Sequence, residues 1–378
     1  MVEQGVAKMH DRITKDTAGW HATLREALPH SSSKARLGLA FVDPRAHRLR
    51  VLDGWRGLSI LLVLAGHMLP IGPKWLELNS MVAAAGLSIF FCLSGFLIVS
   101  MLLRNDNVLS FFTRRFFRIL PLAWLVVLVM LFVEQPAAAA WYSNLFFFAN
   151  LVPAILPHGE QLWSLSVEVQ FYVAVGLAVA SLGSRALFLL PVACLAVTLV
   201  RAVYGMKFSI VTWFCADQIL AGGVLALVLH YVPSVATRRW PAAITLLLFA
   251  ALFATCHEHL GAANYLRAYV AALLICSTIH PRHDGLHAVL SSRPLGYLAK
   301  VSYALYVIHP LTYAGWLGEG DLWVRYSKRL VSFALTFAAA HLSTMYYEKY
   351  WNEFGHRLAS SIEHRRMRVP GYQSKPTA

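Results

Sequence analysis

A histidine and an arginine lie inside the first long apolar run of this chain. Ten residues separate Arg56 from His67, and eleven steps along an α-helix turn about 1100°, close to three full turns. The two side chains therefore share one helix face, about 16 Å apart along the axis. An imidazole can move protons near neutral pH, and a guanidinium binds anions. Because ionisable groups in a membrane helix cost about 2.5–3.5 kcal/mol each, we expect a functional site inside a helical bundle.

Glu168 lies in a later apolar run, with Ser164 four residues before it and Tyr172 four residues after it. This spacing places the three side chains on one helix face. Counted from the ends of their apolar runs, His67 lies about 6 Å and Glu168 about 9 Å below the same surface of the membrane. A carboxylate beside an imidazole can orient it and raise its basicity, as a general base requires. We therefore predict that Glu168 assists His67.

Three further arginines, Arg114, Arg115 and Arg118, gather near the start of another apolar run. Guanidinium groups match phosphate oxygens with paired hydrogen bonds. Together with Arg56, these arginines predict a phosphate-binding site at the inner end of the bundle, opposite His67. The alternative is that these arginines only set the orientation of the chain in the membrane and bind lipid phosphate.

The elements that position these residues are apolar runs. The chain has 378 residues, of which 58% are hydrophobic and 14% charged. This composition excludes a large soluble domain and predicts an all-α polytopic membrane protein with about ten transmembrane helices. A shorter apolar piece, 141–156, reads as a re-entrant or interfacial segment. The expected spans are 54–71, 80–103, 116–133, 162–182, 186–204, 210–232, 242–256, 264–280, 298–317 and 329–347.

The formal net charge of +14 is distributed unevenly along the chain. Lys and Arg concentrate in alternate loops and in both terminal segments, whereas 134–161 contains neither. The positive-inside rule then places both termini in the cytoplasm. The basic charge indicates orientation and attraction to anionic membrane lipid, and we expect no nucleic-acid partner.

Residues with metal-binding spacing also occur outside these runs. They are His280, His283, Asp284 and His287, and the group 257–259. Neither group has a cysteine partner or a defined scaffold, so we expect no metal. The five cysteines lie in apolar segments without paired spacing and are predicted to be small buried hydrophobic residues.

Five motifs follow one another along the chain: 52–57 (LDGWRG) with His67, 90–98 (FFCLSGFLI), 114–121 (RRFFRILP), 163–172 (WSLSVEVQFY) and 295–310 (LGYLAKVSYALYVIHP). In residues and in order, they resemble the motifs of the acyltransferase-3 family of bacterial integral-membrane O-acyltransferases. Two departures are visible: Trp55 stands where the family usually has Leu, and the proline that commonly follows Glu348 by two positions is missing, which leaves the role of Glu348 open.

The resemblance implies an enzyme of the bacterial cytoplasmic (inner) membrane. It would move an acyl group, usually acetyl, from cytoplasmic acetyl-CoA or another acyl-CoA to a hydroxyl of an extracytoplasmic carbohydrate or glycolipid, such as exopolysaccharide, O-antigen or lipo-oligosaccharide. The family's arginine–histidine motif falls on Arg56 and His67, its glutamate motif on Glu168, and its arginine-rich motif on the three arginines named above. The acceptor, the acyl chain and the oligomeric state stay undetermined.

The resemblance also divides the chain into a basic N-terminal tail (1–50), a transmembrane acyltransferase domain (51–350) and a basic C-terminal tail (351–378). Family members with a fused hydrolase domain carry a long C-terminal extension. With the short tail present here, we expect the protein to complete the transfer unaided or to pass acyl groups to a separate partner.

In the mechanism that we expect, His67 is the general base that takes the proton from the acceptor hydroxyl. An acyl intermediate on His67 is the alternative and would give double-displacement kinetics. Ser94 is expected to permit close helix packing and not to act as a nucleophile. His309 is either a second polar site or a histidine beside a proline kink. The supporting residues are Ser94, Trp163, Ser164, Tyr172 and His309.

Two other functions fit the membrane composition. A transporter of a glycan or lipid-linked precursor could use Arg56, His67 and Glu168 as a proton relay. The sequence shows neither the internal repeats nor the broken half-helices that are typical of such transporters. A membrane scaffold would need none of the three aligned side chains, and mutating them would leave its function intact.

Overall fold

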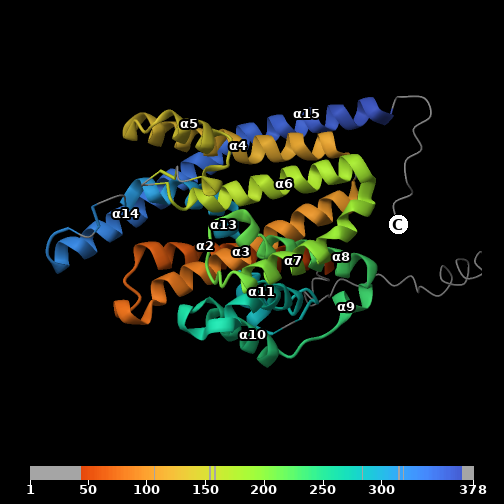
Figure 1. Cartoon of the computed structure of the whole chain (residues 1–378), viewed down its shortest axis with the longest axis horizontal. Helices are drawn as coiled ribbons and strands as arrows, with labels where there is room; N and C mark the ends of the chain where they lie inside the picture. Colours follow the sequence, from red (N-terminus) through yellow and green to blue (C-terminus); the bar gives the residue numbers. More distant parts are fainter. Residues whose placement is uncertain are drawn as a thin grey trace, which may run out of the picture. The chain divides into compact units, whose positions relative to one another are not determined.

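The computed structural model describes residues 44–105, 107–152, 155–156, 159–282, 284–313, 316–317 and 319–367. Every regular element in these ranges is a helix, which confirms the all-α prediction (Figure 1). Most of the expected N-terminal tail, the last residues of the expected C-terminal tail, and His283 lie outside the described residues.

Each range that was expected to cross the membrane overlaps at least one helix. Among the described residues, only α3, α4 and a continuous helical stretch from Leu162 to Val203 are long and apolar enough to cross a membrane, by length and composition. The count of about ten spans is therefore not confirmed, because several of the other helices are short. The helices are α2 (Pro44–Met68), α3 (Leu78–Arg104), α4 (Val108–Glu134), α6 (Leu162–Leu182), α7 (Leu190–Val203), α8 (Asp217–Tyr231), α10 (Ala242–Cys256), α11 (Arg267–Cys276), α13 (Arg293–Tyr313) and α14 (Leu322–Leu342).

Short helices connect these elements. The piece expected to be re-entrant or interfacial, 141–156, overlaps α5 (Ala138–Leu145) and contains η2 (Ala149–Leu151). The others are η1 (Lys74–Leu76), η3 (Gly183–Leu189), η4 (Thr212–Phe214), α9 (Pro233–Thr237), η5 (Glu258–Leu266), α12 (Gly285–Leu290) and the π-helical η6 (Ser343–Glu348).

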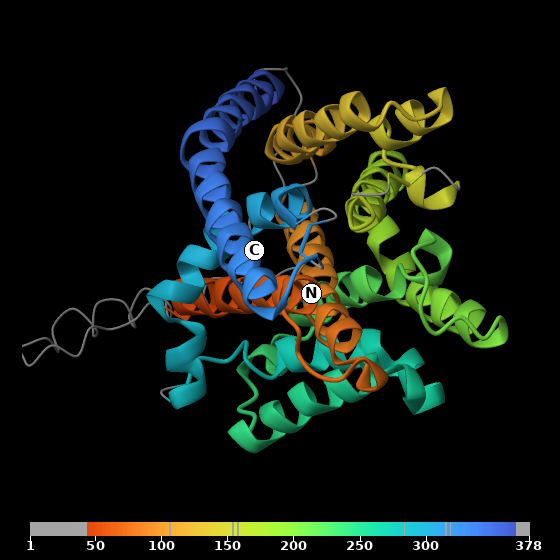
Figure 2. The same ribbon diagram turned by 90° about the vertical axis from the view of Figure 1, so that its left-hand side faces the viewer.

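The segment expected to be a C-terminal tail is mostly a regular helix, α15 (Lys349–Met367). It lies along α4 (Figure 1), while α10 and α11 lie on the other side of α3 (Figures 1 and 2). The charge of this segment predicted its basic character but not its order. Its apolar contacts supply that order: Phe354 and Trp351 pack on Phe117 of α4, with ring centroids 5.0 and 6.0 Å away.

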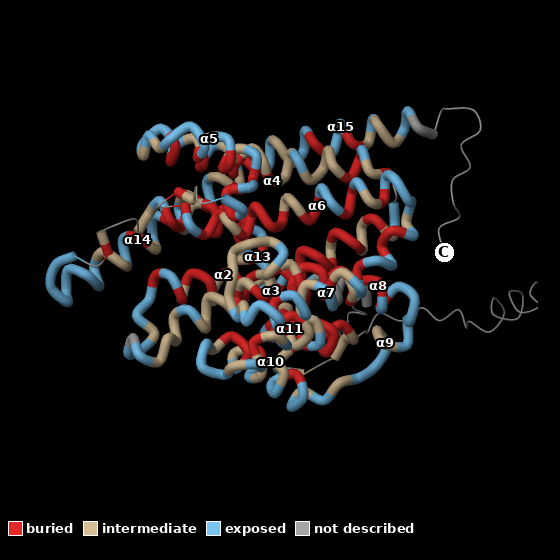
Figure 3. The backbone as a smooth tube through the Cα atoms, in the orientation of Figure 1, coloured by how far each residue is buried: buried red, intermediate tan, exposed pale blue. Residues whose placement is uncertain are grey.

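The core is centred on α3, about half of whose residues are buried (red in Figure 3). Two glycines allow α3 and α8 to touch. A Cβ atom at Gly95 would lie 1.8 Å from the carbonyl oxygen of Ile219, and one at Gly222 would lie 1.9 Å from that of Cys92. Such close backbone approach is how helices associate in an apolar solvent, where burial supplies little driving force.

Glycines of the first motif bring α2 against α12 and α13 in the same way. A Cβ atom at Gly54 would lie 1.9 Å from the carbonyl oxygen of Leu290, and one at Gly57 would lie 2.3 Å from that of Leu295. The contact runs along the helices, so that the C-terminal end of α2, which carries His67, lies beside the C-terminal half of α13, which carries His309.

Candidate functional site

Two histidines from distant parts of the chain meet at one end of α2. The Nδ1 atom of His67 lies 3.0 Å from the Nε2 atom of His309. Their rings meet edge to edge, with centroids 5.2 Å apart and planes 19° from parallel. His309 is fully buried, whereas His67 is exposed. The sequence left the place of His309 open, and the structure puts it directly behind the histidine that was expected to react.

Glu168 is also buried, but its hydrogen-bond partners are not the two histidines. Its Oε1 atom accepts a hydrogen bond of 2.5 Å from Ser94 of α3 and another from the hydroxyl of Tyr172. Among the described residues, the hydrogen bonds of Glu168 do not reach His67, so the expected direct contact is not observed. Depth along a helix axis had suggested that contact, but depth does not fix the rotation of α6, which turns Glu168 toward α3.

The other face-sharing residue of α6, Ser164, connects to the histidine pair. The oxygens of Ser164 and Tyr306 lie 2.5 Å apart, and Tyr306 also donates to the carbonyl of Gln161. The carbonyl of Tyr306 lies 2.7 Å from Nδ1 of His309. The N-terminal turn of α6 is thus tied to α13 at the residue that contacts His309.

A cavity of about 270 Å³ lies among α2, α3, α4, α6, α13 and α15. It contains Glu168 with Ser94 and Tyr172, so the predicted glutamate and the predicted arginines line one space. The cationic lining residues are Arg56, Arg114, Arg115 and Arg118.

The four arginines of this cavity differ in how their charge is balanced. Arg114 donates to both carboxylate oxygens of Glu363 at 2.9 Å. Arg115 contacts the sulfur of Met101 and lies over the ring of Tyr172. Within the described ranges, no carboxylate lies at ion-pair distance from Arg56, Arg115 or Arg118. Three guanidinium groups therefore face one cavity without an ion-pair partner, an arrangement that suits a phosphate-bearing ligand.

Helix α15 supplies residues of this site that the sequence analysis missed. Asn352 and His356 line the arginine cavity, and Glu363 also accepts hydrogen bonds from Asn105 and Ser110. Burial and the neighbouring guanidinium groups, of which Arg114 is the largest contributor, lower the pKa of His356. The spacing of Asn352, His356 and Glu363 could have revealed them, because residues four and seven positions apart share a helix face.

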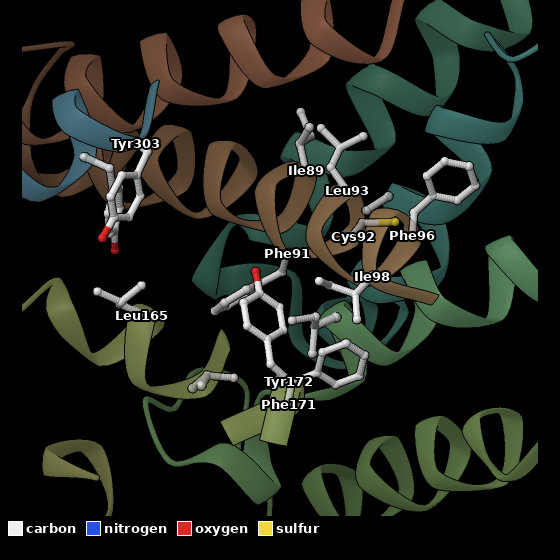
Figure 4. Packing of buried hydrophobic residues seen from close by; sticks show 14 of the residues in the cluster. Ile89, Phe91, Cys92, Leu93, Phe96, Ile98, Leu165, Phe171, Tyr172 and Tyr303 are labelled. Carbon is white, nitrogen blue, oxygen red and sulfur yellow. The ribbon is translucent and has the colours of Figure 1, made fainter. Parts of the chain in front are cut away.

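Packing around Glu168 is aromatic. Figure 4 shows Phe171 and Tyr172 of α6 beside Phe91 and Ile98 of α3. The half-buried ring of Trp163 meets Phe91 edge-on, with centroids 5.9 Å apart. Trp163 thus packs α6 on α3 and holds the turn that carries Ser164.

Two tyrosines of the last motif were not singled out from the sequence. Tyr303 donates a hydrogen bond of 2.5 Å to the carbonyl of Ile119 on α4, and Tyr306 makes the contacts described above. With His309, they form a row at intervals of three residues, and this helical spacing could have revealed them.

Glu348, whose role the sequence left open, is bonded within its own helical turn. It accepts hydrogen bonds from Thr344 at 2.9 Å and from Ser343 at 3.4 Å, in the π-helical segment η6. The next residue toward the N-terminus, Tyr347, donates to the carbonyl of Pro121. This part of the chain therefore joins α14 and α15 to the proline of α4.

The described residues contain no cluster of three or more His, Cys, Asp or Glu that could hold a metal ion. Asp284 caps α12 and contacts His287, whose Nε2 lies 3.2 Å from the carbonyl of Thr278. His283, the remaining member of that group with Asp284 and His280, falls outside the described ranges.

Three curated proteins are similar in sequence to this chain. Protein YrhL of Bacillus subtilis (strain 168) is 29% identical over 316 residues, which are 68% of this chain and 47% of YrhL. The peptidoglycan O-acetyltransferase OatA of Listeria monocytogenes is 23% identical over 360 residues, or 79% of this chain and 54% of OatA. The O-acetyltransferase OatA of Staphylococcus aureus is 25% identical over 311 residues, or 68% of this chain and 49% of that protein.

The chain thus spans about half the length of the curated relatives that it matches. No solved structure matches it. A family model described as an acyltransferase domain matches residues 49–348. This match contains every motif on which the resemblance rested, and it covers α3, α4, α6 and α13, which carry most of the site. The chain therefore belongs to the acyltransferase-3 family.

Proposed function

We propose that this protein is a membrane O-acyltransferase that moves an acyl group, in the first instance acetyl, from acyl-CoA to a hydroxyl of a cell-envelope carbohydrate. The names of two relatives support O-acetyl transfer, and one of these names specifies peptidoglycan as the acceptor. For this chain, the acceptor class is a carbohydrate or glycolipid hydroxyl on the extracytoplasmic side, and both termini lie in the cytoplasm of a bacterium.

The observation that carries this proposal is the convergence of Arg56, Arg115 and Arg118 on one cavity without ion-pair partners in the described chain. Acyl-CoA bears phosphate groups, and each guanidinium can donate two parallel hydrogen bonds to phosphate oxygens. Unpaired arginines gathered inside a helical bundle are costly, so a bound anion explains why they are kept together.

The acyl end of the donor would extend from this cavity toward His67. There, the imidazole accepts the proton of the acceptor hydroxyl while the hydroxyl oxygen attacks the thioester carbonyl. A carbon–oxygen bond forms, the carbon–sulfur bond breaks, and the leaving thiolate takes the proton back from the imidazolium. His67 is suited to this role because it is exposed to an incoming hydroxyl while its other ring nitrogen is held.

Glu168 contributes from the arginine cavity in this scheme. A carboxylate that is held by two hydroxyl donors beside several guanidinium groups offsets part of their mutual repulsion. Any assistance to His67 would pass indirectly, through Ser164 on the same face of α6 and its contact with Tyr306. Glu168 thereby supports donor binding more directly than proton transfer.

The test is an acetyl-transfer assay with purified protein in liposomes, labelled acetyl-CoA and oligosaccharides derived from peptidoglycan or other envelope glycans. Label should appear as an ester on the acceptor. Arg118→Gln should raise the KM for acetyl-CoA by more than about tenfold, because an ion-pair-strength contact is lost. Arg185→Gln is the matched control, since Arg185 is exposed and lies outside the cavity. Transport of the glycan without consumption of acetyl-CoA would refute the proposal.

A further inference from the structure

The environment of His309 determines which of its ring nitrogens carries hydrogen. Its Nδ1 atom lies 2.7 Å from the carbonyl oxygen of Tyr306 and 3.2 Å from that of Leu305. A carbonyl oxygen can only accept a hydrogen bond, so Nδ1 must be the donor. The hydrogen of His309 is therefore on Nδ1.

The proline that follows His309 explains why this carbonyl is free. In a helix, the N–H of residue 310 would donate to the carbonyl of Tyr306, but Pro310 has no N–H. The carbonyl needs another donor because it is buried, and the imidazole one residue earlier supplies it. The two hydrogen bonds of the Tyr306 hydroxyl to α6, with Ser164 and Gln161, hold this turn in place.

His309 is fully buried, and among the described residues no carboxylate is hydrogen-bonded to it. A buried imidazole without an acidic partner stays neutral. A neutral imidazole with hydrogen on Nδ1 has a lone pair on Nε2. That lone pair lies 3.0 Å from Nδ1 of His67, which must therefore donate the hydrogen of this contact.

We infer that His309 is a positioning residue that fixes His67 in the tautomer with hydrogen on Nδ1 and a lone pair on Nε2. Without this contact, either nitrogen of an exposed imidazole can carry the hydrogen. With this contact, the ring nitrogen on the far side from His309 is the base. The nearly coplanar, edge-to-edge arrangement of the two rings sets the direction in which that base points.

The consequence for catalysis rests on the function proposed above. The acceptor proton moves to Nε2 of His67, and the resulting imidazolium keeps its Nδ1–H bonded to His309. Because His309 accepts this hydrogen bond throughout, it stabilises the cation without gaining or losing a proton. The alternative is a purely structural bridge between α2 and α13, which would make no distinction between tautomers.

Two substitutions of similar polarity separate these roles. In His309→Gln, the amide can place its oxygen near the former Nε2 position and accept from His67. In His309→Asn, the shorter amide reaches only the former Nδ1 position, so His67 loses its acceptor. We expect kcat to stay within about tenfold of the parent for the Gln variant and to fall about 100-fold for the Asn variant, as loss of a hydrogen bond to a charged group predicts.

The KM for acetyl-CoA should change little in both variants, because neither substitution alters the arginine cavity. Equal losses of kcat in two folded variants, or no loss in either, would overturn the positioning role. A purely structural bridge would instead be disturbed by both substitutions and would show no rescue by Gln.

A spectroscopic measurement tests the tautomer without any substrate. In protein labelled with 15N-histidine and reconstituted in nanodiscs, the signals of His67 are identified by their loss in His67→Asn. We expect a protonated Nδ1 and an unprotonated Nε2, and this pattern should be lost in His309→Asn. A protonated Nε2 in the parent protein would overturn the inference. Absence of acetyl transfer together with the expected tautomer would instead refute only the proposed function.

Discussion

Ser94 of α3 donates a hydrogen bond of 2.5 Å to Glu168 of α6, a residue 74 positions later in the chain. This bond holds the carboxylate in the cavity that Arg56, Arg115 and Arg118 line, whereas His67 contacts His309. The site thus has two parts, one built around cations and one around a histidine pair, and they can be tested separately.

The first prediction concerns the two buried glutamates. Glu168→Gln should raise the KM for acetyl-CoA and lower kcat/KM by more than about tenfold, because the guanidinium groups lose a compensating charge and the hydrogen bonds of Ser94 and Tyr172 weaken. Glu348→Gln is the control: Glu348 is bonded to Thr344 within its own turn and acts on Arg118 without an ion pair, so the KM should change much less while the melting temperature falls. Steady-state kinetics and thermal unfolding measure both effects. Similar KM changes in the two variants would contradict this assignment.

A second prediction distinguishes two neighbouring arginines. Arg114 is already paired with Glu363, whereas Arg115 has no ion-pair partner in the described chain. We expect Arg115→Gln to raise the KM for acetyl-CoA by more than about tenfold and Arg114→Gln by less than about threefold, since a phosphate gains less from a guanidinium that is already paired. Titration of acetyl-CoA in the liposome assay measures both values, and the reverse order would exclude this division of roles.

A third prediction follows from the lowered pKa of His356. Burial and the charges of Arg114, Arg118 and Arg115 disfavour its protonated form. A bound phosphate offsets these charges and raises the pKa of His356, so donor binding takes up a proton. The KM for acetyl-CoA should therefore decrease as the pH falls through the range where His356 titrates in the complex. His356→Asn should remove this slope, and a slope that persists in the variant would assign it to another group.

The fourth prediction tests the contact between α3 and α8. A Cβ atom at Gly95 would lie 1.8 Å from the carbonyl of Ile219, so Gly95→Ala should separate the helices and destabilise the fold by about 1–3 kcal/mol. Gly296→Ala is the matched control within another helix, because open space surrounds Gly296. That variant should be neutral or slightly stabilising. Unfolding in detergent, followed by circular dichroism, reports both, and equal stability of the two variants would argue against the close contact.

The sequence predicted much of the fold, for reasons that are local. Long apolar runs interrupted by basic loops indicated the helices, and each expected span overlaps at least one. Their number as membrane spans did not follow, because α7, α8, α10 and α11 are short for a bilayer. The helix over 349–367 was missed, since its basic residues resemble a solvated tail and its order comes from aromatic contacts with α4.

For the site, residue types were easier to predict than partners. Spacing along one helix placed Ser164, Glu168 and Tyr172 on one face, and all three are buried together. The partners of Glu168 and His67 depend on how α6 and α13 are rotated against α3 and α2, which a single sequence does not specify. For this reason Ser94 and His309 were named only as supporting residues, although they make the direct contacts.

The central claim is that His67 removes the acceptor proton. Its most direct test compares acetyl transfer from labelled acetyl-CoA by the parent protein, His67→Ala and His341→Ala in liposomes. His341, exposed on α14, is the control. We predict that His67→Ala abolishes transfer while acetyl-CoA still binds at the arginine cavity, and that His341→Ala behaves as the parent. Full transfer by His67→Ala would contradict the account.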